Sequence, residues 1–259
     1  MTGVHPDFCI FFAATIRDIG GYVKREGLAL KERFLLRFLE VAEQLQDGGR
    51  FLCRKEDLRP CLNDAQGTSP FDAHYIYHTA WAARVLARTR PASHIDISSS
   101  LYFVSIASAF VPITFYDYRP APLTLGNLRC KRADLTSLPF ADESVDSLSC
   151  MHVVEHIGLE RYGDSFSPQG DIAAMRELVR VLGNGGRLLF AVPIGGVAKI
   201  HYNAHRIYTY SAVLEAFGSL CLEEFALVTD RGEFIAHASE AEAQQQKYGC
   251  GCFLFRKQK

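Results

Sequence analysis

The chain has 259 residues, with 28 lysines and arginines against 29 aspartates and glutamates, and a formal net charge of -1. This balance excludes the polybasic surface that strong, non-specific nucleic-acid binding needs, because lysine and arginine supply that affinity by neutralising phosphates. The eight cysteines are scattered through a chain large enough to form a core without disulfides. We therefore expect a cytoplasmic protein with reduced thiols and no nucleic-acid partner.

The first 68 residues differ from the rest of the chain. Between residues 34 and 45, apolar residues recur at helical spacing, charged residues occupy the other faces, and Asp47-Gly48-Gly49 ends the pattern. The pattern predicts an amphipathic helix in a helical N-terminal extension, which packs on the main domain or on a partner chain. A homo-oligomer could form through it. The polar stretch at residues 63–69 is a candidate linker to a second domain at residues 69–259.

In the second domain, predicted strands and helices alternate. Residues 69–72 (SPFD) supply an N-cap serine, a first-turn proline and a capping-box acid for a helix that runs to about residue 86. Residues 167–168 (SP) cap another helix, which runs to residue 182 and ends at the glycine-rich residues 183–186. We predict a third helix at 101–110 and strands at 94–97, 112–117, 128–133, 145–153 and 187–193.

The end of the chain contains two strand-like runs, residues 222–229 and 251–256, which can pair antiparallel at the edge of the sheet. With the five earlier strands, this order predicts a doubly wound, mostly parallel α/β sheet of seven strands. Residues 97–116 carry no charge and have the length of a membrane span. Several serines and Pro112 interrupt them, and a covered strand, helix and strand would also be uncharged. We therefore expect no membrane span.

Three acids follow successive predicted strands: Asp96, Asp117 and Asp134. In open α/β sheets the ligand lies at the carboxyl ends of the strands. Asp117 comes 21 residues after Asp96, where an acid that accepts hydrogen bonds from two ribose hydroxyls is expected. The turn after the first strand, residues 98–100 (SSS), contains no glycine. A nicotinamide cofactor, whose pyrophosphate must approach bare backbone, is therefore not expected.

Five segments, in sequence order, resemble the successive motifs of class I S-adenosylmethionine-dependent methyltransferases. They are residues 134–140 (DLTSLPF), 144–148 (SVDSL), 154–156 (VEH), 177–182 (ELVRVL) and 185–189 (GGRLL). The resemblance covers roughly residues 93–256. Within this superfamily, residues 155–164 (EHIGLERYGD) and 203–208 (NAHRIY) resemble an uncharacterised methyltransferase-like family of bacteria and nematodes.

The resemblance implies the Rossmann-like methyltransferase fold, with S-adenosylmethionine as cofactor and S-adenosylhomocysteine as product. It places Asp96 beside the methionine part, Asp117 on the ribose hydroxyls and Asp134 on the adenine amino group. The other implied cofactor-binding residues are Ser98, Ser100, Tyr118, Leu135 and His152. The chain departs from the family at Ser98, Ser100 and Tyr102, where methyltransferases usually have glycine.

Candidate catalytic residues follow the fourth and fifth predicted strands. His156 and His205 lie on the ligand side of the sheet, and an imidazole is suited to take the proton of an acceptor hydroxyl. A structural histidine bonded to the backbone explains either one equally well. We predict that both histidines converge on one cavity, with Glu155 near its rim. Three tyrosines could line this pocket, face the sulfonium or simply pack: Tyr162, Tyr202 and Tyr208.

These features predict a methyltransferase that acts on a small-molecule or saccharide-like acceptor at a hydroxyl. No Asn/Asp-Pro-Pro-Tyr/Phe segment, which the resemblance would associate with transfer to an amide or base nitrogen, is present. The alternative is a non-catalytic binding module that retains the fold.

Residues 152–156 (HVVEH) also match the HxxEH pattern of zinc peptidases. A shared zinc requires both histidines on one face of a helix, whereas a strand separates positions four apart by about 13 Å. The surrounding residues predict a strand, and Cys250 and Cys252 alternate on a terminal strand in the manner of core residues. We therefore expect no metal site.

Overall fold

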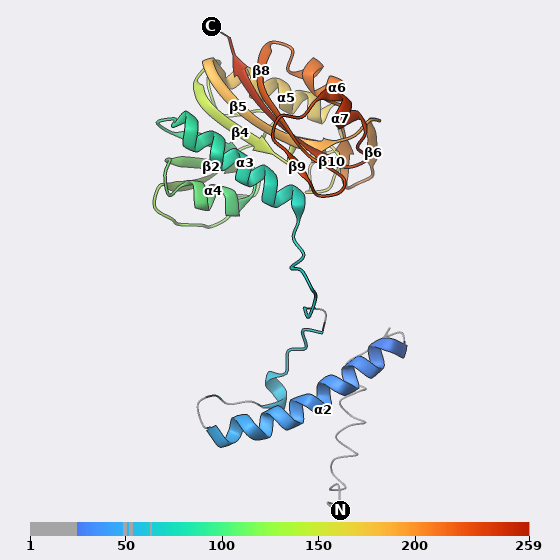
Figure 1. Ribbon diagram of the computed structural model, residues 1–259. Coiled ribbons are helices and arrows are strands. Elements are labelled where there is room, and N and C mark those ends of the chain that lie inside the picture. Colours follow the sequence, from blue (N-terminus) through green and yellow to red (C-terminus); the bar gives the residue numbers. More distant parts are fainter. Residues whose placement is uncertain (1–24, 49–50, 52–53, 63, 259) are drawn as a thin grey trace, which may run out of the picture. The chain divides into compact units, whose positions relative to one another are not determined.

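The structure, a computed structural model, describes residues 25–48, 51, 54–62 and 64–258. The chain divides into two compact units between Pro70 and Phe71 (Figure 1). The sequence places this boundary after residue 68.

The first unit contains helix α2 (Arg25–Gly48) and the 3-10 turn η1 (Lys55–Asp57). The predicted helix at 34–45 lies within α2, which ends at the predicted glycine. Leu35 and Ala42, seven residues apart, are buried, whereas Arg37 and Glu40 are exposed and form an ion pair of 2.7 Å. The helix is therefore amphipathic, as its sequence pattern predicts. Its role in an oligomer stays a prediction.

The second unit is built on an eight-stranded sheet in the order β3-β2-β1-β4-β5-β10-β8-β9. Its strands are β1 (His94–Ile97), β2 (Ile113–Asp117), β3 (Leu128–Arg132), β4 (Val145–Met151), β5 (Leu182–Ile194), β8 (Leu220–Val228), β9 (Phe234–Ile235) and β10 (Gly249–Lys257). Strands β1 to β5 pair in parallel, and the remaining pairs, β10 with β5 and β8 and β8 with β9, are antiparallel.

The prediction of a doubly wound, mostly parallel sheet is confirmed, but the sheet has eight strands and not seven. The additional strand β9 has two residues, which is too short for an alternating pattern to reveal. Strands β10 and β8 do pair antiparallel, as predicted, but β10 lies inside the sheet and β9 forms the edge. A separate hairpin, also not predicted as two strands, is formed by β6 (Lys199–His201) and β7 (His205–Ile207).

Helices cover both faces of the sheet (Figure 1). Helices α3 (Ala73–Thr89) and α4 (Leu101–Ala107) share one core; α5 (Gly170–Val181), α6 (Tyr210–Ala216) and α7 (Glu240–Gln244) share the other. The first core joins Val85 of α3 and Val104 of α4 to Leu189, and the second joins Leu178 of α5 to Phe190. Leu189 and Phe190 are neighbours in β5, so strand alternation sends them into opposite cores.

The uncharged residues 97–116 form the end of β1, helix α4 and most of β2. This is the covered strand, helix and strand that the sequence predicts. Among the described residues, we find no helix with both the length and the apolar character of a membrane span.

The two predicted helix caps lie three and two residues before the observed ones. The N-cap of α3 is Asp72 and not Ser69, because the Asp72 carboxylate accepts from the Tyr75 amide at 3.1 Å. Helix α5 begins at Gly170, because the Ser167 amide donates instead to the carbonyl of Gly158 at 3.0 Å. Gly158 has φ +77°, and a Cβ there would lie 2.3 Å from the Ser167 carbonyl oxygen. Only glycine allows this closed loop.

The glycine-rich residues 183–186 do not form the predicted turn after α5. Leu182 already begins β5, and it pairs with Val145 at the start of β4. A Cβ on Gly186 would lie 2.8 Å from the carbonyl oxygen of Gly183. The glycines therefore serve a bulge in which two stretches of backbone come close together.

Candidate functional site

The turn after β1 is held by hydrogen bonds among its own polar groups. Asp96 is buried; one carboxylate oxygen accepts from the Ser99 amide at 3.0 Å, and the other accepts from the Ser149 hydroxyl. The Ser99 hydroxyl accepts from the Met151 amide at 3.0 Å, which ties the turn to the end of β4. Burial raises the pKa of Asp96 to about 6. Both carboxylate oxygens of Asp96 are therefore used to hold this turn in place.

Ser98 takes a left-handed backbone conformation, which favours glycine. Its φ is +55°, and its amide and hydroxyl both donate to the Tyr116 carbonyl, at 2.7 and 3.2 Å. Ser100 is the N-cap residue of α4, and Tyr102 is 85% exposed. The turn at residues 98–100 thus has a left-handed residue at Ser98, and the Tyr102 side chain extends into solvent.

Two further predicted acids lie at the same edge of the sheet, because β2 and β3 are parallel neighbours. Asp117 ends β2 and is partly exposed; its Oδ1 accepts from the Arg119 amide at 2.7 Å. Asp134 follows β3, and its Oδ1 accepts from the amide and hydroxyl of Thr136 at 2.8 and 2.7 Å. Of the neighbouring predicted residues, Tyr118 is 45% exposed and Leu135 is buried.

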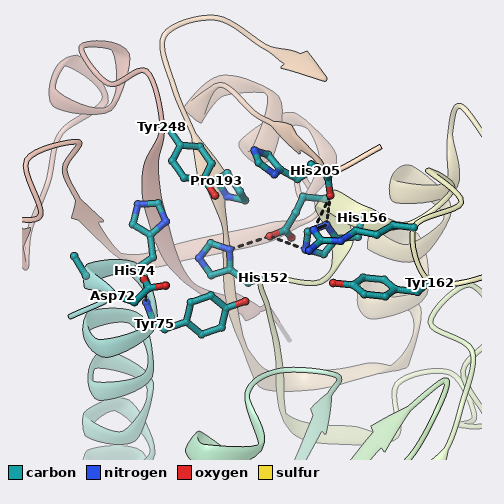
Figure 2. A pocket seen from close by; sticks show the side chains of 13 residues that line it. Asp72, His74, Tyr75, His152, His156, Tyr162, Pro193, His205 and Tyr248 are labelled. Carbon is teal, nitrogen blue, oxygen red and sulfur yellow. Dashed lines mark hydrogen bonds and ion pairs between the residues drawn. The ribbon is translucent and has the colours of Figure 1, made fainter. Parts of the chain in front are cut away.

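A cavity of about 390 Å³ lies beyond the end of β4 (Figure 2). Its lining comes from the start of α3, the loop after β4, the end of β5, the β6–β7 hairpin and the residue before β10. Four of the nine histidines line it: His74, His152, His156 and His205. Met151, which bonds to the serine turn at residues 98–100, is followed directly by His152, a predicted cofactor-binding residue that lines the cavity.

His152 leaves the strand that was predicted to continue to Val153. It has φ +56°, an uncommon conformation for a residue other than glycine, and it begins the loop after β4. Its Nδ1 contacts Glu155 Oε1 at 2.8 Å, and its Nε2 contacts Cys250 Sγ at 3.2 Å. Burial opposes a charge on His152, but its interactions with Cys250 and Glu155 raise its pKa above the usual value. Burial raises the pKa of the Cys250 thiol.

Glu155 lines the cavity as a fully buried residue, so the predicted position at the rim is wrong. It lies in the 3-10 turn η2 (Val154–His156), which directs its carboxylate inward. Its Oε1 contacts His152 and lies 3.8 Å from His156 Nε2. Its Oε2 is buried without a hydrogen-bond partner among the described residues. A buried oxygen without a partner lowers the stability of the folded protein unless a ligand or water donates a hydrogen bond to it.

The structure brings His156 and His205 to the same cavity, as predicted, with ring centroids 6.5 Å apart. His156 Nδ1 donates to the carbonyl of Ala204 at 2.6 Å, and Arg161 donates to the same carbonyl at 2.9 Å. Burial lowers the pKa of both imidazoles. His205 Nε2 is buried and, among the described residues, has no partner. The catalytic roles of both histidines stay predictions.

The two histidines of the HVVEH segment do not lie on an extended strand, so that premise of the sequence argument is wrong. His152 and His156 are joined by the turn η2 and contact the same Glu155 carboxylate. The pattern nevertheless does not form a helical HxxEH site, because His152 pairs with Cys250 of β10 and not with His156.

Of the three candidate tyrosines, Tyr162 lines the cavity. Tyr202 is 73% exposed and outside the lining, and Tyr208 is a buried packing residue whose hydroxyl donates to Asp171 at 2.9 Å. The same Asp171 carboxylate lies 3.5 Å from the buried Arg206, which donates to the Ile157 carbonyl at 2.7 Å. This group fixes the loop after β4 against α5.

Several residues of the cavity were not predicted from the sequence, among them His74, Tyr75, Arg161 and Tyr248. Tyr75 stacks on His152 with centroids 5.4 Å apart, and burial raises the pKa of Tyr75 to about 12. One signal was available for Tyr248, because a last strand antiparallel to β5 must begin at the edge where β5 ends; Gly249 indeed pairs with Ile194. His74 and Tyr75 gave no signal beyond their position in the first turn of a helix.

The sequence matches a family model described as "Caenorhabditis protein of unknown function, DUF268" over residues 138–231, which is less than half of the chain. This segment contains residues 155–164 and 203–208, on which the predicted resemblance to a nematode family depends. No curated protein matches the chain.

Solved structures share the fold at low identity. The Burkholderia thailandensis 1,6-didemethyltoxoflavin-N1-methyltransferase, solved with its substrate and S-adenosylhomocysteine, has a TM-score of 0.51 and 12% identity, over 78% of this chain and 100% of that chain. A putative sarcosine dimethylglycine methyltransferase from Galdieria sulphuraria has a TM-score of 0.51 and 14% identity, over 71% and 86%. The chain therefore has the fold of class I S-adenosylmethionine-dependent methyltransferases.

Proposed function

We propose that this protein transfers a methyl group from S-adenosylmethionine to a hydroxyl of a small-molecule or saccharide-like acceptor bound in the histidine-lined cavity. The observation that carries the proposal is the bond between Ser99 and Met151, which ties the predicted cofactor turn to the residue directly before His152, a residue of the cavity lining. The names of the two structural neighbours, both small-molecule methyltransferases, support the reaction class.

The residues at the carboxyl edge fit the cofactor. Ser98 holds a left-handed conformation and bonds to the Tyr116 carbonyl, which fixes the turn beside the proposed site of the methionine part. Asp117 is partly exposed and can accept hydrogen bonds from two ribose hydroxyls. Asp134 and Leu135 would receive the adenine. When bound, S-adenosylmethionine supplies the methyl group: its carbon–sulfur bond breaks as the carbon–oxygen bond forms, and S-adenosylhomocysteine leaves.

His156 is the proposed general base. Its Nδ1 is committed to the Ala204 carbonyl, so Nε2 carries the lone pair that can accept the hydroxyl proton. Because burial lowers its pKa, the imidazole is neutral near pH 7 and ready to accept. The carboxylate of Glu155, 3.8 Å from Nε2, stabilises the imidazolium that forms. His205 and Tyr162, which line the cavity, bind and orient the acceptor.

Titration calorimetry with S-adenosylmethionine and S-adenosylhomocysteine tests the proposal. The wild type should bind both, and Asp117→Ala should lose about 3 to 6 kcal/mol of binding free energy, because two charge-assisted hydrogen bonds disappear. That is an affinity loss of about 100- to 10,000-fold. The control is Asp142→Ala, which removes an exposed carboxylate and should leave cofactor affinity unchanged. Absence of binding by the wild type at millimolar cofactor would reject the enzyme and favour a binding module that retains the fold.

The acceptor atom is tested separately with a methyl-labelled cofactor and two acceptor sets, one of hydroxyl compounds that includes saccharides and one of small amines. Label recovered on oxygen supports the proposal. Label recovered only on nitrogen would keep the methyltransferase and reject the hydroxyl acceptor.

A further inference from the structure

Three potential metal ligands from distant parts of the chain meet beside the cavity. Two of them, His74 and His152, lie close together in Figure 2. His74 comes from the first turn of α3, His152 from the loop after β4, and Cys250 from β10. One ligand atom from each lies within 4.8 Å of the other two, and this is the one such group of three or more among the described residues. Imidazole nitrogen and thiolate sulfur are the donors that zinc prefers.

The distances are close to those of a zinc site. Zinc bonds of about 2.0 to 2.1 Å to nitrogen and 2.3 Å to sulfur separate tetrahedral ligand atoms by about 3.3 to 3.7 Å. His152 Nε2 lies 3.2 Å from Cys250 Sγ, so these two already have nearly the required separation. His74 is half-buried and lies at the N-terminal end of its helix. A movement of about 1 Å by its side chain brings its ring nitrogen to the separation that a shared zinc ion requires.

Glu155 gives His152 the orientation of a metal ligand. A carboxylate oxygen only accepts hydrogen bonds, so the contact of 2.8 Å places a proton on His152 Nδ1. Nε2 then presents its lone pair toward Cys250. A metal ion would bind that lone pair and the thiolate, and the thiol proton would be released. Metal-binding histidines usually donate their other N–H to a carboxylate in this way. The adjacent cavity also contains two unpartnered buried atoms, Glu155 Oε2 and His205 Nε2, which a metal-bound water or acceptor could satisfy.

We propose that His74, His152 and Cys250 bind one zinc ion whose fourth coordination position faces the cavity. Three protein ligands with an open position are the pattern of a reactive zinc site and not of a structural one. The proposal replaces the expectation from the sequence that no metal binds here: the partners of His152 are Cys250 and His74 and not His156. Use of the open position to hold the acceptor hydroxyl rests on the proposed function; zinc binding itself does not.

Two measurements on the full chain, purified without a histidine tag, test the site. Equilibrium dialysis against Zn²⁺ alone, followed by elemental analysis, should give one equivalent of zinc. Replacement by Co²⁺ should give a thiolate-to-cobalt charge-transfer band in the near ultraviolet, together with the visible bands of a tetrahedral ion. Wild-type protein that retains no zinc at micromolar Zn²⁺, or that binds Co²⁺ without a thiolate band, would overturn the proposal.

Matched variants separate this site from the HVVEH pattern. Cys250→Ser should abolish the thiolate band, and His74→Gln should weaken zinc binding at least tenfold. His156→Gln should retain full zinc binding. Glu155→Gln should weaken it by about 10- to 100-fold, because it disturbs a positioning residue. Loss of zinc in His156→Gln with normal binding in His74→Gln would contradict the proposal, and the wild-type cobalt spectrum decides the matter if a variant does not fold.

Calorimetry with S-adenosylmethionine on zinc-free protein distinguishes the two proposals. Cofactor binding without any zinc site would reject only the metal, and zinc binding without cofactor binding would reject only the methyltransferase.

Discussion

The serine turn (residues 98–100) and the histidine-lined cavity are neighbours, but they differ in how many of their buried polar groups are hydrogen-bonded. In the turn, Asp96, Ser98 and Ser99 each bond to backbone or side-chain groups of β1, β2 or β4. In the cavity, Glu155 Oε2 and His205 Nε2 are buried without partners among the described residues. The polar groups of the turn are therefore hydrogen-bonded within the fold, whereas the cavity has buried polar groups that a ligand or water must complete. We infer that the turn is a scaffold and that the cavity is where the chemistry takes place.

The largest expected effect concerns the support of the cavity loop. Arg206→Met removes a buried cation beside Asp171 and its bond to the Ile157 carbonyl. Because Asp171 is then left without its charge partner, the free energy of unfolding should fall by about 3 to 5 kcal/mol. Urea denaturation measures this. In the control Arg187→Met, whose ion pair with Glu223 is partly exposed, the loss should stay near or below about 1 kcal/mol. Equal losses in the two variants would contradict a special role for Arg206.

A second prediction separates chemistry from cofactor binding. His156→Gln should lower kcat about a hundredfold or more, because the proposed base is removed, while cofactor affinity stays within about twofold. Steady-state kinetics and calorimetry together measure this. His237→Gln, which changes an exposed histidine outside the cavity lining, is the control and should leave kcat unchanged. If His156→Gln lost cofactor affinity to the same extent, His156 would have a structural role and would not be the proposed base.

The pH dependence gives a third, smaller effect. Burial lowers the pKa of His156, a result opposed by Glu155 and supported by Arg161 and His152. A base must be neutral to accept a proton, so kcat should be constant around neutral pH and fall about tenfold per pH unit only below a pKa that is itself under 6.5. Asp96→Asn, which removes another group that titrates near pH 6, should keep this acid limb. An acid limb above pH 6.5 would exclude His156 as the base.

The smallest effect is expected in the serine turn. Ser98→Gly should change the free energy of unfolding by less than about 1 kcal/mol, because the serine already holds φ +55° and its loss of strain offsets the lost hydroxyl bond. Ser98→Val should cost more, since β-branched residues are strongly disfavoured at positive φ. Thermal unfolding compares the two variants. A large increase in the free energy of unfolding for Ser98→Gly would show instead that the backbone of the turn is strained at Ser98.

The sequence predicts the scaffold better than the cavity, for physical reasons. Strand alternation and the acids after β1, β2 and β3 are local patterns, so the sheet and the predicted edge residues could be found along the chain. The cavity joins His74 of α3 to Cys250 of β10, and only the sheet order brings such distant residues together. A single backbone angle, the φ of +56° at His152, also turned the HVVEH segment away from the predicted strand. Residue patterns do not encode that turn.

The most direct test of the account is a structure of the protein in complex with S-adenosylhomocysteine. The account predicts that the ribose hydroxyls bond to Asp117, that the methionine part lies against the serine turn, and that the sulfur points into the cavity. The position of the transferred methyl group should then lie within direct or single-water reach of the imidazole of His156 or His205. A sulfur that points away from the cavity, with both imidazoles more than about 10 Å from the methyl position, would contradict the account, because that distance exceeds any such proton transfer.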